Sequence, residues 1–191
     1  MTRSRVSPVP STRIRVLLLV LLLAVLMPAG SAAQRTDGRR WGTALAADGM
    51  QASGTVGSEN ARVGQVWYFA LPVPGNISDE PIGITRAAVE HVPPGIEVLG
   101  YGAYDMSDTD GLPLLATEGE PHTPDFARLR NYADRAVEVP AGETSDIFYA
   151  VRLKITSPPE GPVRRCRFEY TQDGRAYTQT MDCELLLTVA G

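Results

Sequence analysis

Carboxylates that could bind a metal ion lie together in residues 105–111 (DMSDTDG). Calcium loops need clustered oxygen ligands and a glycine for a sharp turn. Asp108 and Asp110 match the second and third ligand positions of the EF-hand pattern, but Met106 stands at the first aspartate position and the final glutamate is missing. Two interpretations stay open: a calcium site formed by Asp105, Asp108 and Asp110, or an acidic loop tip between strands, which we favour.

Histidine supplies many general bases and metal ligands, and the chain has two, His91 and His122. Neither belongs to a spaced metal motif, and no Gly-x-Ser-x-Gly nucleophile elbow is present. We therefore expect two surface histidines and no enzymatic activity, and a hydrolase using His91 or His122 is the least favoured hypothesis.

A group of basic residues near the C-terminus could bind an anionic wall polymer or lipid headgroups if their strands adjoin. Its members are Arg152, Lys154, Arg164, Arg165, Arg167 and Arg175. The competing interpretation, which we favour, is a solvated face whose arginines are neutralised by acidic residues on the neighbouring strand.

Aromatic residues and glycines alternate near residue 100 and faintly suggest a ligand platform. Gly100 and Gly102 share one face of a predicted strand, which allows close approach of a neighbouring group. Tyr101, Tyr104 and Trp67 would supply the aromatic surface, although aromatic residues on strands more often belong to the core.

The two cysteines, Cys166 and Cys183, lie in a predicted terminal hairpin. Placing them opposite each other aligns Phe168 with Met181, Arg167 with Asp182 and Arg165 with Glu184, and it leaves residues 173–176 as the loop. Apolar then faces apolar and positive faces negative along the hairpin. Because the chain carries an export signal (below) and has no other cysteine, we expect a Cys166–Cys183 disulfide.

Short strands separated by Pro and Gly turns indicate an all-β fold. The clearest pattern is residues 146–156, where Ile147, Tyr149, Val151, Leu153 and Ile155 share one face. Further strands are expected at 63–71, 81–92 (with a bulge near Arg86), 96–104 and 136–139. Thr123 as N-cap, Pro124 as the first residue and apolar residues at helical spacing predict one short helix at 124–134.

The N-terminus predicts export. Four arginines precede twelve apolar residues, Val16–Met27, and the small residues 29–33 follow, which is the pattern of a signal peptide. The apolar run is shorter than the roughly 20 residues of a spanning helix, so we expect no transmembrane anchor after cleavage. Cleavage near residue 33 leaves 14 basic and 22 acidic residues, a net charge of −8, which disfavours nucleic acid as a partner.

From residue 63 to 189 the pattern resembles bacterial extracellular immunoglobulin-like domains. The resemblance rests on the turn before IEVLGYGAY, the turn before DIFYAVRLKI, and the cysteine-linked terminal hairpin. It implies an immunoglobulin-like antiparallel β-sandwich over residues 61–191, with the short helix inserted, after a signal peptide (1–33) and a flexible segment or weakly attached first strand (34–60).

By analogy, such a domain implies a secreted, non-enzymatic interaction module of the bacterial cell envelope or medium, with a protein or envelope polymer as partner. The alternative is a secreted domain that binds a small ligand or calcium through residues 105–111. No other cofactor is expected.

Overall fold

The computed structural model describes residues 39–46 and 55–190, which are almost entirely strands and turns. The strands are β1 Arg40–Trp41, β2 Leu45–Ala46, β3 Thr55–Ala61, β4 Val66–Ala70, β5 Gly75–Asn76, β6 Ile82–His91, β7 Ile96–Asp105, β8 Leu115–Thr117, β9 Val137–Val139, β10 Ile147–Ile155, β11 Val163–Gln172 and β12 Arg175–Val189. Within these residues one 3₁₀ turn, η2, spans Met106–Thr109. The all-β prediction is therefore confirmed.

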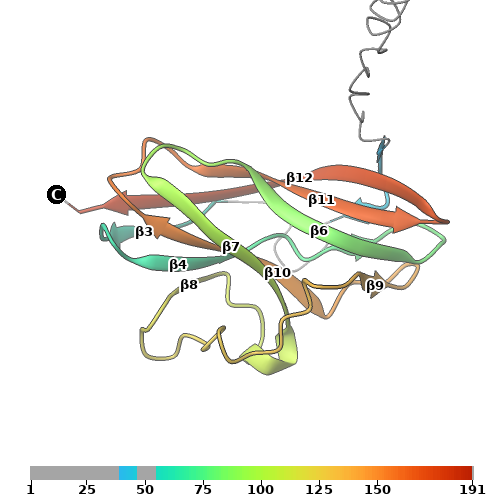
Figure 1. Cartoon of the computed structure of the whole chain (residues 1–191), viewed down its shortest axis with the longest axis horizontal. Coiled ribbons are helices and arrows are strands. Elements are labelled where there is room, and N and C mark those ends of the chain that lie inside the picture. Colours follow the sequence, from blue (N-terminus) through green and yellow to red (C-terminus); the bar gives the residue numbers. More distant parts are fainter. Residues whose placement is uncertain (1–38, 47–54, 191) are drawn as a thin grey trace, which may run out of the picture. The chain divides into compact units, whose positions relative to one another are not determined.

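Two main sheets share one hydrophobic core (Figure 1). The larger sheet has the order β1-β12-β11-β6-β9, with β3 also paired to β12, and the smaller has the order β7-β10-β4-β8. Tyr149 of β10 meets Phe168 of β11 edge to face, with ring centroids 6.0 Å apart. Strands β2 and β5 form a separate small pair. The described residues therefore form a β-sandwich.

Strand β10 is buried on both of its faces. Its inward set, including Tyr149, Val151 and Leu153, belongs to the core between the sheets, as the alternation predicted. Phe148 and Ala150 point the opposite way and belong to a second cluster on the outer face of the smaller sheet. This second cluster is covered by the long connection between β8 and β9, which we call the cover segment (residues 118–136).

The cover segment contains no helix, so the prediction of a helix at 124–134 is wrong. Its backbone makes local turns and also bonds to the edge strand β7: the Tyr132 N–H donates to the Ala103 carbonyl at 2.8 Å. The Asn131 side chain accepts from the Ala103 N–H at 3.0 Å. Because these tertiary hydrogen bonds satisfy polar groups of the segment, the apolar spacing of Phe126 and Leu129 serves packing on the sheet instead of a helix face.

The N-terminal strands add two parallel pairs to a sandwich that we expected to be wholly antiparallel. Strands β1 and β3 both run parallel to β12 along the edge that β11 leaves free. Strands β1 and β3 pair with β12 without a connecting hairpin, so no turn residues in the sequence predict this pairing. Strand β1 thus docks on the sheet, although the side chain of Trp41 is 78% exposed.

The predicted signal peptide (1–33) lies outside the described residues, and the boundaries at 33 and 60 stay predictions. Within the described residues no helix is long and apolar enough to cross a membrane.

The bulge predicted near Arg86 is confirmed: the β6–β11 register shifts between Ile84 and Arg86. The predicted register of the terminal hairpin is wrong by two residues. Asp173 and Gly174 adopt positive φ values of 50° and 69°, as a two-residue type I′ turn requires. Gln172 therefore pairs with Arg175, and Cys166 lies opposite Met181 instead of Cys183. Between the turn and Cys166 the slip is an even number of residues, so these side chains keep their predicted faces.

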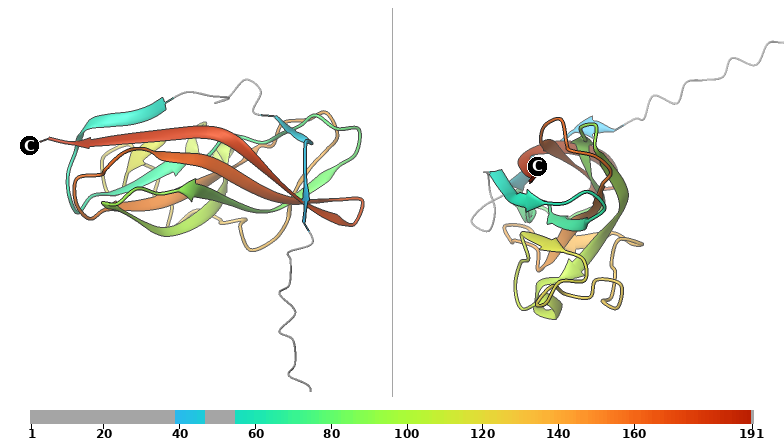
Figure 2. Two further views of the ribbon diagram at one scale, coloured as in Figure 1. Left: turned by 90° about the horizontal axis from the view of Figure 1, so that it is seen from above. Right: turned by 90° about the vertical axis from the view of Figure 1, so that its left-hand side faces the viewer.

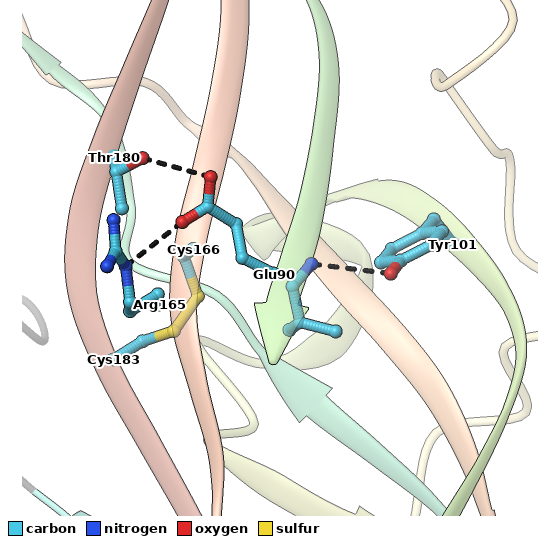
Figure 3. Close-up of a disulfide and its surroundings, with 7 residues drawn as sticks. Glu90, Tyr101, Arg165, Cys166, Thr180 and Cys183 are labelled. Atoms are coloured by element: carbon cyan, nitrogen blue, oxygen red, sulfur yellow. Dashed lines mark hydrogen bonds and ion pairs between the residues drawn. A yellow bond between two sulfur atoms is a disulfide. The ribbon is translucent and has the colours of Figure 1, made fainter. Parts of the chain in front are cut away.

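The Cys166–Cys183 disulfide is confirmed (Figure 3). It joins β11 to β12 where the register shifts at Arg165, whose φ is 63°. On the outer face of the same sheet, Arg165 pairs with Glu90 of β6 at 3.0 Å, and Glu90 also accepts from the Thr180 hydroxyl of β12. Three adjacent strands are thus cross-linked beside the disulfide.

We predict that the Cys166→Ala/Cys183→Ala double variant folds with an unfolding free energy lower by about 3 kcal/mol, because the disulfide closes a loop of 17 residues in the unfolded chain. Urea denaturation of the variant and of the oxidised wild type measures the difference. A loss below about 0.5 kcal/mol would show that strand pairing alone holds the hairpin.

Candidate functional site

The acidic residues 105–111 are organised as a turn. Asp105 ends β7, and its carboxylate accepts from the Ser107 hydroxyl at 2.7 Å and from the Ser107 N–H at 2.8 Å. These hydrogen bonds hold the pKa of Asp105 below its usual value. Asp108 and Asp110 are exposed, and in the described part of the chain no three His, Cys, Asp or Glu side chains are grouped to hold a metal ion.

The basic residues proposed as a binding strip lie on two different sheets. Arg152 and Lys154 belong to β10, whereas Arg165, Arg167 and Arg175 belong to β11 and β12. Strand β10 pairs with β4 and β7 and not with β11, so the strands do not adjoin and the strip is not formed.

Most of these arginines are paired with carboxylates. Arg152 pairs with Glu118, Arg164 with Glu184, Arg165 with Glu90 and Arg167 with Glu169. The expected Arg165–Glu184 and Arg167–Asp182 pairs are wrong, because the hairpin register moved.

The two histidines belong to different parts of the fold. His91 ends β6 in the larger sheet, and His122 lies in the cover segment over the smaller sheet.

A hollow lies between the smaller sheet and the cover segment. It has a volume of about 700 Å³. Figure 2 shows the cover segment on the side of the domain that carries β7 and β10, away from β12. The lining comes from β4, β7, β10 and the cover segment, and includes Tyr68, Gly100, Gly102, Tyr104, Glu118, Glu120, Asp125, Phe126, Asn131, Ala150 and Arg152. We call this hollow the outer-face cavity.

The cavity exists because three neighbouring positions of the sheet carry almost no side chain. Gly100 pairs with Arg152 and Gly102 pairs with Ala150 across β7 and β10, so the centre of the outer face is low. A Cβ placed on Gly100 would have no heavy atom within 4 Å, whereas one on Gly102 would collide with the Tyr104 ring. Gly100 therefore faces open space, and Gly102 makes room for Tyr104.

Three aromatic rings that pack on one another form one wall. Phe126 stacks on Tyr68 with centroids 4.1 Å apart and meets Tyr104 edge to face at 4.9 Å. All three side chains are less than a tenth exposed, because the faces of their rings pack against one another and against the sheet. The Tyr104 hydroxyl lies over Gly102, and it makes no hydrogen bond to any other residue in 39–46 or 55–190.

An ion pair lies beside this wall, since Arg152 of β10 is the cross-strand neighbour of Tyr68 of β4. The Arg152 Nε and Nη2 donate to the two carboxylate oxygens of Glu118 at 2.7 and 2.8 Å. The guanidinium holds the pKa of Glu118 below its usual value. Burial, and then the negative charge of Glu118, raise the pKa of Tyr68 to about 12. The cavity thus combines a fixed bidentate pair, two phenol groups that stay protonated at neutral pH, and aromatic packing.

The sequence pointed to part of this site. Alternation places Gly100 and Gly102 on one face of a strand, and the ligand-platform hypothesis includes Tyr104. Trp67 instead lies in the core between the sheets, and the Tyr101 hydroxyl accepts from the Val89 N–H at 3.3 Å (Figure 3). The contributions of Phe126 and Glu118 were missed, because only the path of the cover segment brings them to β4 and β10.

No protein-family model matches the chain, and no curated protein is significantly similar to it. Among solved structures, the VesB protease of Vibrio cholerae aligns over 70% of this chain and 30% of that chain, with 12% identity and a TM-score of 0.32. The match thus spans less than a third of the protease chain, and a likeness at this TM-score supports no argument about fold or activity.

The two glycines give a matched pair of predictions. We expect Gly102→Ala to lower the unfolding free energy by about 1–3 kcal/mol, because the added methyl forces the packed Tyr104 ring to move. Gly100→Ala should leave stability equal or slightly higher, since its Cβ meets nothing. Thermal and urea unfolding compare the two variants with wild type, and equal losses in both would contradict the assigned geometry.

The Arg152–Glu118 ion pair predicts that stability depends on pH. Because the pKa of Glu118 is lowered in the folded state, its pair with Arg152 stabilises above the ordinary glutamate pKa, and that stabilisation is lost as pH falls through the lowered value. In Arg152→Gln the pKa of Glu118 should rise, as followed by carboxyl-carbon NMR. Arg164→Gln, which removes a pair on the other sheet, is the control, and an unchanged Glu118 in Arg152→Gln would refute the assignment.

Proposed function

We propose that this protein is a secreted, non-enzymatic binding module of the bacterial cell envelope or medium, built on an immunoglobulin-like sandwich. We further propose that it recognises its partner, a protein or an envelope polymer, with the outer-face cavity. The observation that carries this proposal is the cavity itself: a hollow of about 700 Å³ in which the Tyr104 hydroxyl has no partner among the described residues.

The polar composition of the cavity supports binding. Ligand sites are typically concave and combine apolar walls with a few fixed polar groups. Here the aromatic wall is rigid, since Tyr68, Tyr104 and Phe126 pack on one another. The Tyr104 hydroxyl makes no hydrogen bond within the described residues although the residue is only 6% exposed, so this hydroxyl remains able to donate to or accept from a ligand.

The export part of the proposal rests on the N-terminal pattern and on the disulfide. Disulfides persist in oxidising compartments, and Cys166 and Cys183 form one in this chain. The non-enzymatic part rests on the separation of the two histidines, His91 on the larger sheet and His122 in the cover segment.

The experiment fills the cavity and asks whether the partner is lost. Wild type, Gly100→Leu and Arg175→Leu are tagged at the C-terminus, produced in the bacterium that encodes the protein, and mildly crosslinked. Gly100→Leu places its side chain in open space, and Arg175→Leu adds the same side chain at an exposed position of the other sheet.

We expect crosslinked material from envelope or medium with wild type and Arg175→Leu, and its loss with Gly100→Leu. Circular dichroism must show that all three proteins fold. The intact mass of the recovered wild type tests cleavage near residue 33. Equal crosslinking by the folded Gly100→Leu variant would refute the cavity as the binding site.

A further inference from the structure

The chemistry of the outer-face cavity indicates the class of its ligand. This inference rests on the proposed function, since it concerns the same cavity. Three acidic residues line it, Glu118, Glu120 and Asp125, against one basic residue, Arg152. Glu120 and Asp125 are exposed, and no ion pair joins either of them to a basic side chain within the described residues. The cavity therefore carries a net negative charge at neutral pH.

The same geometry disfavours anions. An anionic ligand would need Arg152, but the Nε and Nη2 donors of that guanidinium are already committed to Glu118 in a bidentate pair. Glu120 and Asp125 would in addition repel a second negative charge. An anion would thus have to displace a carboxylate from an optimal partner.

The aromatic wall disfavours a sugar ring. Sugar stacking needs an open aromatic face, and here the exposed fractions of Tyr68, Tyr104 and Phe126 are 7%, 6% and 4%. What these rings offer to the cavity is the Tyr104 hydroxyl, which can accept a hydrogen bond from a cationic donor.

The edge of β7 provides a place for a peptide main chain. Strand β7 is the outermost strand of the smaller sheet. At Ala103 its outward N–H and carbonyl bond to Asn131 and Tyr132. Tyr101 is two residues away with no bulge between, so its N–H and carbonyl point outward too. Tyr101 lines the cavity, and in the described part of the chain no segment beyond the β7–β10 ladder bonds to its backbone.

We infer that the outer-face cavity binds an arginine or lysine side chain presented by a partner polypeptide. The cationic head lies between Glu120 and Asp125, and the Tyr104 hydroxyl accepts from it. The aliphatic stem runs over Gly100 and Ala150, where the sheet carries no bulky side chain. The partner main chain lies along the outward backbone groups of Tyr101, as an added strand does at a sheet edge.

The probe is the peptide acetyl-Gly-Gly-Arg-Gly-Gly-amide, compared with the same peptide carrying citrulline, which keeps the shape and loses the charge. Binding is followed by amide NMR shifts of the whole secreted protein at about 20 mM and about 300 mM NaCl. We expect saturable shifts at Gly100, Tyr101 and Gly102 with the arginine peptide. Affinity should fall at least about tenfold with citrulline, and it should also fall at the higher salt concentration.

Two double variants test the residues. Glu120→Gln/Asp125→Asn should weaken the arginine peptide at least about tenfold. Asp108→Asn/Asp110→Asn removes two exposed carboxylates from the acidic turn and should leave binding unchanged. If both double variants weakened binding of the arginine peptide equally, the effect would come from general surface charge, and the assignment of Glu120 and Asp125 to the site would be overturned.

A third comparison tests the polypeptide. Acetyl-arginine-amide carries the same head without the flanking main chain, and we expect it to bind at least about tenfold more weakly than the peptide. Equal affinity would show that the cavity takes a free small cation, which overturns the peptide part of the inference.

The outcomes separate this inference from the proposed function. If Gly100→Leu loses the crosslinked partner but the citrulline and arginine peptides bind equally, the cavity is the binding site and its ligand is not a cation. If Gly100→Leu keeps the partner, the proposed function fails, whatever the peptides do.

Discussion

The alternation of β10 is the constraint on which the rest of the described structure depends. One face of this strand supplies Tyr149, Val151 and Leu153 to the core between the sheets, and the other supplies Phe148, Ala150 and Arg152 to the outer face. Because side chains alternate between the two faces of a strand, a shift in register that moves the core residues also moves the residues of the outer face. The core of the sandwich and the floor of the cavity are therefore fixed by a single register between β10 and its neighbours β4 and β7.

The outer face would normally be polar, because one side of an antiparallel sheet commonly meets water. Here its β4 end is apolar and is covered by Phe126, while the middle of β7 and β10 is left low by Gly100, Gly102 and Ala150. The cover segment contacts the edge of β7 through Asn131 and Tyr132 and the face of β4 through Phe126. It is held at both ends of the low region, and the hollow between these contacts is a consequence of that anchoring.

Much of the fold could be read from the sequence, because its signals are local. Alternation located β6, β7 and β10, and the phase change near Arg86 located the bulge. The errors arose where tertiary contacts outweigh local signals. The apolar spacing from Phe126 to Tyr132 looks helical, but hydrogen bonds to Ala103 bind that segment to a strand edge. The hairpin register failed because the prediction placed Cys166 directly opposite Cys183, a choice that the charge pairs also supported, whereas the Asp173-Gly174 turn determines the structure.

The candidate site was harder to predict than the fold because its polar members are far apart in sequence. Glu118 and Arg152 are 34 residues apart in the sequence. Glu118 follows β8, which is separated from β10 by β4 in the sheet, and no local sequence signal predicts this strand order. The prediction of a basic strip was wrong because closeness in sequence does not mean closeness in space. Arg152 and Arg165 are near in sequence but belong to different sheets. Once Arg152 faces Glu118, its charge is neutralised within the protein. Glu120 and Asp125 then determine the electrostatic character of the cavity, so the site is acidic although the strand beneath it is basic.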